Sequence, residues 1–242
     1  MKKTRPTILP AVPPVYRRLM DEAKKRGVSL EGIRYAVSGA MNLPPELVAE
    51  WEEASGGFMV EGYGLTETIG PVSVNTDWLN KIGTVGPPVC GNEIRIGEDE
   101  EIQVRGIGVF STYHNNPSAT ADAFTADGWF RTGDIGALDE DGYLRITGRK
   151  KELIVTAGGK NVAPAPLEDR LRGHPLVSQV LVVGENRPCI GALLTLDAEM
   201  LPLWLSSHGL EEMTVVDAAR DPRVRAALEK AVARTNEAVS RA

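Results

Sequence analysis

Cysteine and histidine are scarce in this chain, and neither is placed as a metal site would require. The 242 residues include two cysteines, Cys90 and Cys189, and three histidines, which are scattered along the sequence. No cluster of these residues has the spacing of zinc ligands. Two isolated cysteines are typical of small buried residues in a reducing compartment. The sequence therefore predicts no zinc site, two buried cysteines and a cytoplasmic location.

Long hydrophobic runs are absent as well. The longest apolar stretches, such as 180–183 and 190–194, are far too short to span a bilayer. The basic start is followed by prolines that interrupt any signal-peptide core. The formal net charge of −6 argues against nucleic acid as the main partner. With 42% hydrophobic and 25% charged residues, the composition predicts a globular protein of one large or two to three small domains.

Residues 1–79 alternate between helix and strand signals. A helical pattern after Pro14 ends at Gly27, and a strand is expected at 33–37. A second helix opens at Pro45, and a short strand at 58–61 follows it, running directly into a glycine loop. Strand, helix, strand is the pattern of a parallel α/β sheet, in which ligands bind at the carboxyl ends of the strands.

Residues 80–148 show a strand pattern in place of the helix and strand alternation that precedes them. Polar and apolar side chains alternate on both sides of the turns 97–100 and 139–142. Each pattern predicts a β-hairpin. We therefore expect a small antiparallel β unit that resembles a barrel.

Residues 149–242 predict an α+β domain. A strand at 153–155 leads to a helix near 167–171, and two apolar strands follow at 177–183 and 190–196. A last helix begins after the N-cap Asp221, with Pro222 in its first turn. Its buried stripe is expected to contain Val224, Leu228, Ala231, Val232, Thr235 and Val239.

A basic segment at 148–164 stands out in this acidic chain. Arg149, Lys150, Lys151 and Lys160 surround the pair Gly158–Gly159. Local positive charge indicates an anionic ligand such as a phosphate, and glycines let the backbone approach a ligand closely. The same residues would also fit a basic hairpin rim with a glycine turn.

Residues 62–68 combine several groups suited to a nucleotide. Gly62 and Gly64 bracket Tyr63, whose ring can stack on a flat base, and two threonines offer hydroxyls to phosphate oxygens. Glu67 offers the hard oxygen that Mg²⁺ prefers when it also holds substrate phosphates. The alternative is a polar glycine turn in which Tyr63 packs and Glu67 is a solvated charge.

Residues 128–135 place a carboxylate after a Thr-Gly turn. Asp134 in that position is suited to accept two hydrogen bonds from a ribose diol. The alternative is a turn in which Asp134 only caps the backbone.

These three segments, in this order, resemble the adenylate-forming enzymes, which include acyl-CoA synthetases, luciferases and peptide-synthetase adenylation domains. The resemblance runs from Ser38-Gly39 to about residue 200, and it is greatest to long-chain fatty-acyl-CoA synthetases of the actinobacterial type. It implies an α/β fold: the remnant of a parallel α/β layer domain (1–79), a small antiparallel β-barrel-like unit (80–148) and an incomplete, mobile C-terminal α+β domain (149–242).

The resemblance also implies roles for individual residues. Tyr63 would stack on adenine and Thr66 would touch the α-phosphate. Glu67 would hold Mg²⁺, and Asp134 and Arg149 would bind the ribose. The remaining assignments are a loop against adenine at Gly39 and Ala40, a glycine loop at Gly62 and Gly64, a catalytic hinge at Lys151, and a passage for the CoA thiol at Gly158 and Gly159.

Two features of the family are not found in this sequence. One is the Ser/Thr/Gly-rich phosphate loop, and the other is a lysine near the C-terminus, since Lys230 precedes any such position. The expectation is a C-terminal portion of an ATP-dependent long-chain fatty acid–CoA ligase, truncated at both ends and inactive alone. Its partners would be fatty acid, ATP and CoA, with a membrane surface or a separate chain carrying the other half as further partners.

Two alternatives remain open. The chain could be a non-catalytic module that binds an adenylate or another protein. It could also be a fatty-acyl-AMP ligase that never uses CoA, although residues 146–154 leave no room for the insertion that such a ligase carries near the hinge.

Overall fold

The computed structural model describes residues 6–237, and the chain divides into two compact units, 1–150 and 151–242. Each unit has hydrophobic clusters of its own. The division falls in the short 3₁₀ turn η2 (Lys150–Glu152). The three domains predicted from the sequence, with boundaries at 79/80 and 148/149, remain a prediction.

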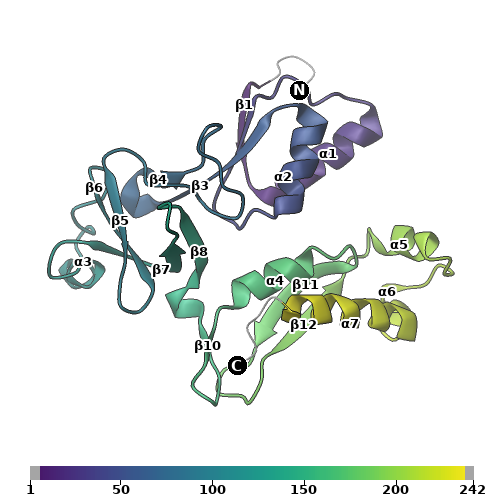
Figure 1. Cartoon of the computed structure of the whole chain (residues 1–242). Helices are drawn as coiled ribbons and strands as arrows, with labels where there is room; N and C mark the ends of the chain where they lie inside the picture. The colour runs from purple at the N-terminus through teal and green to yellow at the C-terminus, as the bar shows by residue number, and fades with distance from the viewer. Residues whose placement is uncertain (1–5, 238–242) are drawn as a thin grey trace. The chain divides into compact units, whose positions relative to one another are not determined.

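The first unit begins with a four-stranded sheet in the order β1-β2-β3-β4 (Figure 1). Strands β1, β2 and β3 are parallel, and β4 pairs antiparallel with β3. In chain order the elements are β1 (Ile8–Ala11), α1 (Pro13–Arg26), β2 (Tyr35–Ser38), α2 (Pro45–Ser55), β3 (Phe58–Leu65), η1 (Thr66–Thr68) and β4 (Gly70–Val74). The expected strand–helix–strand pattern is confirmed. Strand β1 was not predicted, because Pro10 interrupts its pattern, and proline is tolerated there since β1 is an edge strand.

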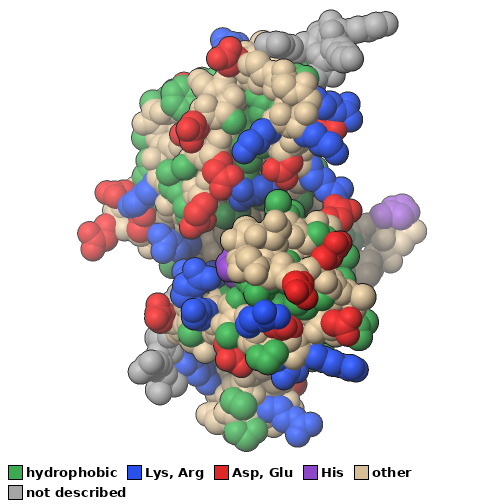
Figure 2. Space-filling model, turned by 90° about the vertical axis from the view of Figure 1, so that its right-hand side faces the viewer, with side chains coloured by type: hydrophobic (Ala, Val, Ile, Leu, Met, Phe, Trp, Pro, Cys, Tyr) green, Lys and Arg blue, Asp and Glu red, His purple; other side chains and the backbone are tan. Residues whose placement is uncertain are grey.

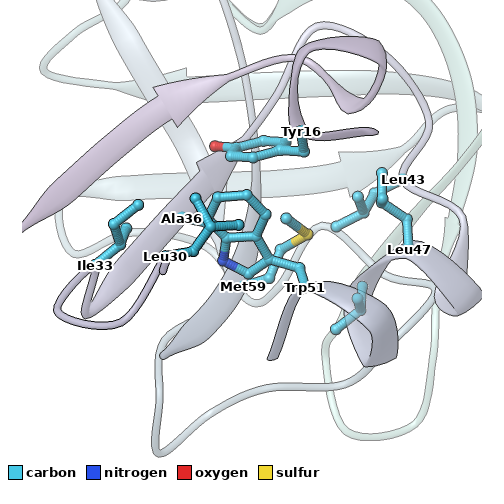
Figure 3. Close-up of a cluster of buried hydrophobic side chains, with 9 residues drawn as sticks. Tyr16, Leu30, Ile33, Ala36, Leu43, Leu47, Trp51 and Met59 are labelled. Carbon is cyan, nitrogen blue, oxygen red and sulfur yellow. The ribbon is translucent and has the colours of Figure 1, made fainter. Parts of the chain in front are cut away.

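Both helices of this sheet begin and end where the sequence indicates. Prolines open them, and each ends at a glycine in the left-handed conformation, Gly27 (φ 61°) and Gly56 (φ 68°). Their apolar faces meet in one cluster, in which the rings of Tyr16 and Trp51 lie edge to face with centroids 4.8 Å apart (Figure 3). The Tyr16 hydroxyl donates to the carbonyl oxygens of Leu9 and Val37, which fastens α1 to β1 and β2.

Strand β3 is longer than expected, because residues 62–65 continue it where the sequence indicated a loop. A Cβ atom at Gly64 would lie 2.2 Å from the carbonyl oxygen of Gly70. Glycine is therefore required at this position by the close approach of β4, a partner strand that the sequence pattern did not predict.

The second sheet of the first unit is antiparallel, in the order β5-β6-β7-β8. Its elements are β5 (Asn92–Ile96), β6 (Glu101–Gly106), α3 (Pro117–Ala123), β7 (Phe130–Leu138) and β8 (Leu144–Arg149). Both predicted hairpins are present. Ile102, Val104 and Leu144 of this sheet share a cluster with Tyr63 and Val72 of the first sheet, so the two sheets pack around one core. The expected mixture of a parallel layer and a curled antiparallel sheet is confirmed.

The second unit is α+β, as predicted. Two small antiparallel ladders pair β9 with β10 and β11 with β12. The elements are β9 (Ile154–Val155), β10 (Asn161–Val162), α4 (Pro164–Arg172), β11 (Val177–Val183), β12 (Gly191–Leu196), α5 (Leu201–Ser207), α6 (Val215–Ala218) and α7 (Pro222–Glu237). Helices α5 and α6 were not predicted.

The final helix begins as the sequence indicates. The Asp221 carboxylate accepts hydrogen bonds from the backbone N–H groups of Arg223 and Val224, at 2.8 and 3.4 Å. Five residues of the expected stripe are buried or half-buried on the inner face of α7, and Val239 lies outside the described residues. The five are Val224, Leu228, Ala231, Val232 and Thr235.

The two cysteines contradict the prediction that they are buried. Cys90 and Cys189 are both free thiols and both exposed, because each lies in a loop rather than in a strand or helix. Segments that connect elements run over the surface, where even a small apolar side chain meets water.

Charge is mixed over the surface. On the face drawn in Figure 2, Lys and Arg side chains alternate with Asp and Glu, and hydrophobic side chains lie between them. Within residues 6–237, no helix is both long enough and apolar enough to cross a membrane.

Glu61 is a buried acid at the carboxyl end of the parallel part of β3. Only 8% of its surface is exposed, and its carboxylate accepts a hydrogen bond from the backbone N–H of Leu43 at 3.3 Å. Burial raises the pKa of Glu61 to about 7, while the Leu43 N–H acts in the opposite direction. The folded protein therefore keeps this proton to a higher pH than the unfolded chain does.

Glu61 gives the unfolding free energy a specific pH dependence. The pKa of Glu61 is higher in the folded protein than in the unfolded chain. Glu61 therefore contributes stability that is fully present below the ordinary pKa of glutamate and is lost as pH rises through 7. Glu61→Gln keeps an acceptor for Leu43 but cannot ionise. We expect its stability relative to the parent to rise by about 2–3 kcal/mol between pH 5 and pH 8, as measured by urea denaturation.

The matched control is Glu53→Gln, which removes an exposed carboxylate from α2. Its stability relative to the parent should not change with pH over the same range. Equal behaviour of the two variants would show that Glu61 is ionised and solvated in the folded protein.

Candidate functional site

The carboxyl ends of β2 and β3 lie side by side. Ser38 and Glu61 are partners in the parallel register, and Gly39 and Gly62 follow them directly. A Cβ atom at Gly39 would lie 3.3 Å from the carbonyl oxygen of Gly62. The structure thus brings two of the predicted site glycines together at the sheet edge where ligands of parallel sheets bind.

The loop after Gly39 has an uncommon backbone. Ala40 adopts a left-handed conformation with φ 64°, which non-glycine residues rarely do. The Ser38 hydroxyl beside it is fully buried and has no hydrogen-bond partner among the described residues. The resemblance already begins at Ser38, whereas Glu61 was not identified from the sequence. The available signal was a polar side chain at the end of each apolar strand.

Tyr63, Asp134 and Arg149 meet in one hydrogen-bonded group. The Tyr63 hydroxyl donates to Oδ2 of Asp134 at 2.6 Å, and Nε of Arg149 donates to Oδ1 at 2.9 Å. Asp134 and Tyr63 are 6% and 8% exposed, while about half of the Arg149 side chain is exposed. Burial, and then the neighbouring Asp134 charge, raise the pKa of Tyr63, so its hydroxyl remains a donor.

A bulge in β7 aims the Asp134 carboxylate. The expected Thr-Gly turn is in fact part of this strand, with Gly133 at φ 73°. Thr132 Oγ1 donates to the carbonyl oxygen of Ile102 at 2.7 Å and accepts from the Asp134 N–H at 3.1 Å. The Gly133 N–H donates to the buried Glu101 at 3.0 Å. These bonds fix the backbone on both sides of Asp134, which a free turn would not do.

The 3₁₀ turn η1 presents Glu67. Its Oε1 accepts from the Tyr113 hydroxyl at 2.9 Å, and its carbonyl oxygen accepts from the Phe110 N–H at 2.8 Å. Thr66 is exposed, whereas Thr68 is buried and its hydroxyl bonds to the backbone of Leu65 and Gly70. The expectation of two phosphate-binding threonines is therefore wrong for Thr68. Tyr113 is a neighbour that sequence reasoning did not identify.

The Glu67 carboxylate suits a metal ion whose other ligands are water and substrate phosphates. Among residues 6–237, no group of three or more His, Cys, Asp or Glu side chains is arranged to hold a metal. Only one Glu67 oxygen is engaged by Tyr113, so the half-buried carboxylate has a second oxygen to offer. A single carboxylate is sufficient for Mg²⁺ when substrate phosphates and water complete its octahedron.

The basic segment is partly neutralised by the protein itself. Lys150 forms ion pairs with Asp99 and, at 3.4 Å, with the buried Glu101. Arg149 pairs with Asp134. These two cations stabilise the antiparallel sheet, so the prediction of a general anion site across the segment is too broad.

Lys151, Gly158 and Gly159 belong to the second unit. Lys151 is its exposed first residue, directly after the division between the units. Gly158 and Gly159 lie in the tight turn between β9 and β10, where the Gly159 N–H donates to Thr156 O at 2.9 Å. Only Gly159, at φ 77°, requires glycine for its conformation. A Cβ atom at Gly158 would make only an ordinary contact with Thr156 Oγ1.

Two family models match this chain. The model of the AMP-binding enzyme matches residues 1–114, and the model of the AMP-binding enzyme C-terminal domain matches residues 151–240. The second match begins at the boundary between the two structural units.

Curated relatives include long-chain fatty acid–CoA ligases. The long-chain-fatty-acid–CoA ligase FadD15 of Mycobacterium tuberculosis is 51% identical over 229 residues, which is 94% of this chain. The chain spans 37% of the length of that relative.

Solved structures agree with this likeness. O-succinylbenzoate coenzyme A synthetase of Bacillus subtilis in complex with AMP is 29% identical, with a TM-score of 0.68 over 84% of this chain and 44% of that protein. The same enzyme with ATP and a magnesium ion is 28% identical, with a TM-score of 0.68 over 86% of this chain and 46% of that protein. The sequence motifs, the folds of both units and these matches together place the chain in the family of AMP-binding, adenylate-forming enzymes.

Proposed function

We propose that this chain provides the ribose-binding carboxylate, the metal-binding carboxylate and the C-terminal unit of an ATP-dependent long-chain fatty acid–CoA ligase. The observation that carries the proposal is the Tyr63–Asp134–Arg149 group beside the Gly39–Gly62 edge, in a chain 51% identical to such a ligase. The reaction would first join a fatty acid to AMP and then transfer the acyl group to CoA. Two free thiols on the surface support a reducing location such as the cytoplasm.

Asp134 is suited to hold a ribose. An ionised carboxylate offers about four lone-pair positions, of which Tyr63 and Arg149 use one each. The remaining positions would accept the two ribose hydroxyls. Because both protein donors hold the carboxylate in place, the ribose would meet an acceptor that is already oriented.

The other proposed contacts follow from position. Thr66 is exposed beside Glu67, so its hydroxyl would donate to the α-phosphate. The adenine would be bordered by the loop of Gly39 and Ala40 and by the strand from Gly62 to Gly64. Tyr63 would offer adenine only the small exposed part of its ring. Mg²⁺, when bound at Glu67, would offset negative charge on the phosphates.

The second unit would serve the CoA step. Lys151 would be the hinge about which this unit turns, and Gly158 and Gly159 would line the passage of the CoA thiol. Contacts with a membrane surface or with a separate chain remain predictions from the sequence.

The proposal is tested with a chimera. This chain replaces the matching segment of the M. tuberculosis FadD15 ligase, and the chimera is assayed for palmitate-dependent ATP–pyrophosphate exchange and for palmitoyl-CoA formation. We expect both activities. A folded chimera that binds AMP but catalyses neither step would instead support the non-catalytic alternative, and adenylation without thioester formation would support the acyl-AMP ligase.

Asp134→Ala should weaken the binding of a non-hydrolysable acyl-AMP analogue to the chimera. Each hydrogen bond to a charged acceptor is worth roughly 1.5–3 kcal/mol, so affinity should fall at least about tenfold. Isothermal titration calorimetry measures the change.

Asp127→Ala is the matched control, since it removes an exposed carboxylate that pairs with Arg95 in the same sheet. It should leave the affinity unchanged. If Asp134→Ala also leaves it unchanged, Asp134 only supports the fold.

Lys151→Pro should separate the two half-reactions. Proline fixes φ and removes the N–H, so a backbone that must rotate at this position would be held in one state. In the chimera we expect pyrophosphate exchange to survive, while thioester formation from preformed acyl-AMP slows at least about tenfold.

Lys151→Ala is the control, because it removes the side chain and leaves the backbone free to rotate. Its two rates should stay in the parent ratio. A proline variant that slows both steps equally, or neither, would exclude Lys151 as the hinge.

A further inference from the structure

The second unit contains an open hollow that the proposed function does not use. It has a volume of about 750 Å³ and is bordered by α7, by α5 with the turn after it, and by His174 before β11. Figure 1 shows α5 and α6 beside the first turns of α7, and the cluster of Trp204, Leu205 and Val224 holds them there. All of these elements belong to one unit.

The titratable side chains that line the hollow are all basic. Arg223, Lys230 and Arg234 extend from one face of α7, and His174 and His208 complete the set. Among the described residues that line the hollow, none is Asp or Glu, in a chain whose formal net charge is −6. Such a local excess of positive charge favours an anionic ligand.

The three cations differ in how far the protein neutralises them. Arg223 forms an ion pair with Asp221 at 2.7 Å. Within residues 6–237, no carboxylate lies within ion-pair distance of Lys230 or Arg234. These two lie one helical turn apart, at positions i and i+4, so both side chains reach the same part of the hollow. Like charges at this spacing destabilise a helix unless an anion lies between them.

The two histidines offer directed polar groups. Nδ1 of His174 accepts from the Leu176 N–H at 3.2 Å, so the neutral ring carries its proton on Nε2 and is a donor there. Burial, and then the charges of Arg234 and His208, lower the pKa of His174. His208 stacks on Trp204 with ring centroids 4.0 Å apart, and its Nδ1 lies 2.9 Å from the Trp204 carbonyl oxygen.

The rest of the lining is apolar. Leu210 and the small side chains of Ala226, Ala227 and Ala233 border the space between the basic groups. A bare phosphate would fill only a small part of 750 Å³. A fitting ligand therefore has an anionic group for Lys230 and Arg234 and an organic group that covers the alanines and the exposed His208 ring.

We infer that this hollow binds a small organic phosphate, with the phosphate between Lys230 and Arg234 and the organic group against His208 and the alanines of α7. A phosphate monoester carries close to two negative charges and three acceptor oxygens. These suit one imidazole N–H and two cations that have no carboxylate partner within residues 6–237. A carboxylate has one charge and would leave one cation unpaired. The inference is independent of the proposed ligase function and of the residues assigned to it.

The test uses the complete 242-residue chain and phenyl phosphate as the probe. The chain has three histidines, so their ring proton signals can be followed individually by NMR. We expect the signals of His174 and His208 to shift saturably, while His114, in the first unit, remains unchanged. Inorganic phosphate should bind at least tenfold more weakly than phenyl phosphate, because it lacks the organic group.

A double variant, Lys230→Gln with Arg234→Gln, should lower the affinity for phenyl phosphate at least tenfold. Arg225→Gln is the matched control, since it removes a cation from α7 outside the hollow and should leave the affinity unchanged. Both sets of side chains are exposed, and circular dichroism checks that the helix is retained.

Phosphatidylcholine vesicles with and without phosphatidic acid distinguish a lipid headgroup from a soluble phosphate. Binding only to phosphatidic acid, lost in the double variant, would identify a lipid as the source of the same phosphate chemistry. Two results would overturn the inference. One is a set of His174 and His208 shifts that never saturate, and the other is a double variant that binds phenyl phosphate as tightly as the parent.

Discussion

The two hydrogen bonds to the buried carboxylate of Asp134 are the interaction on which the first unit depends. A charge at that depth is costly unless donors surround it, and here one donor comes from each sheet. Tyr63 reaches it from β3 of the first sheet, and Arg149 reaches it from β8 of the antiparallel sheet. The same carboxylate therefore links the two sheets, and both of its hydrogen bonds fix the orientation of the group that we propose binds a ribose. Removing either donor would leave a buried carboxylate with one hydrogen bond fewer, which is costly.

The architecture was largely predictable because its signals are local. Proline and glycine delimit α1 and α2, and alternating side chains mark the hairpins of β5 with β6 and of β7 with β8. Strands β1 and β4 were missed for a different reason. Each contains a proline and shows no clear alternation of polar and apolar residues, so these segments become strands only through pairing with β2 and β3. The surface positions of Cys90 and Cys189 likewise depend on the loops that contain them.

The candidate site was predicted at the level of motifs, and the structure adds how the motifs are held. In the sequence, Gly64 indicated a loop that binds a ligand. In the structure, glycine is required there because the backbone of Gly70 lies too close for a Cβ atom. The sequence indicated that the Thr68 hydroxyl donates a hydrogen bond to a phosphate. In the structure this hydroxyl is hydrogen-bonded to the backbone of Leu65 and Gly70. Glu61 lies outside the motifs recognised in the sequence, because the burial of an acidic side chain is known only from the structure. Residue type alone does not separate a group that supports a turn from one that contacts a ligand.

The exposed cysteines have a practical consequence. One thiol lies in each unit, Cys90 in the first and Cys189 in the second, and the sequence contains no others. A donor and an acceptor fluorophore attached to them would report the separation of the units in solution without any engineered residue. The chain thus carries a natural pair of labelling positions for single-molecule energy transfer, through which any rotation at the Lys150–Glu152 turn becomes directly observable.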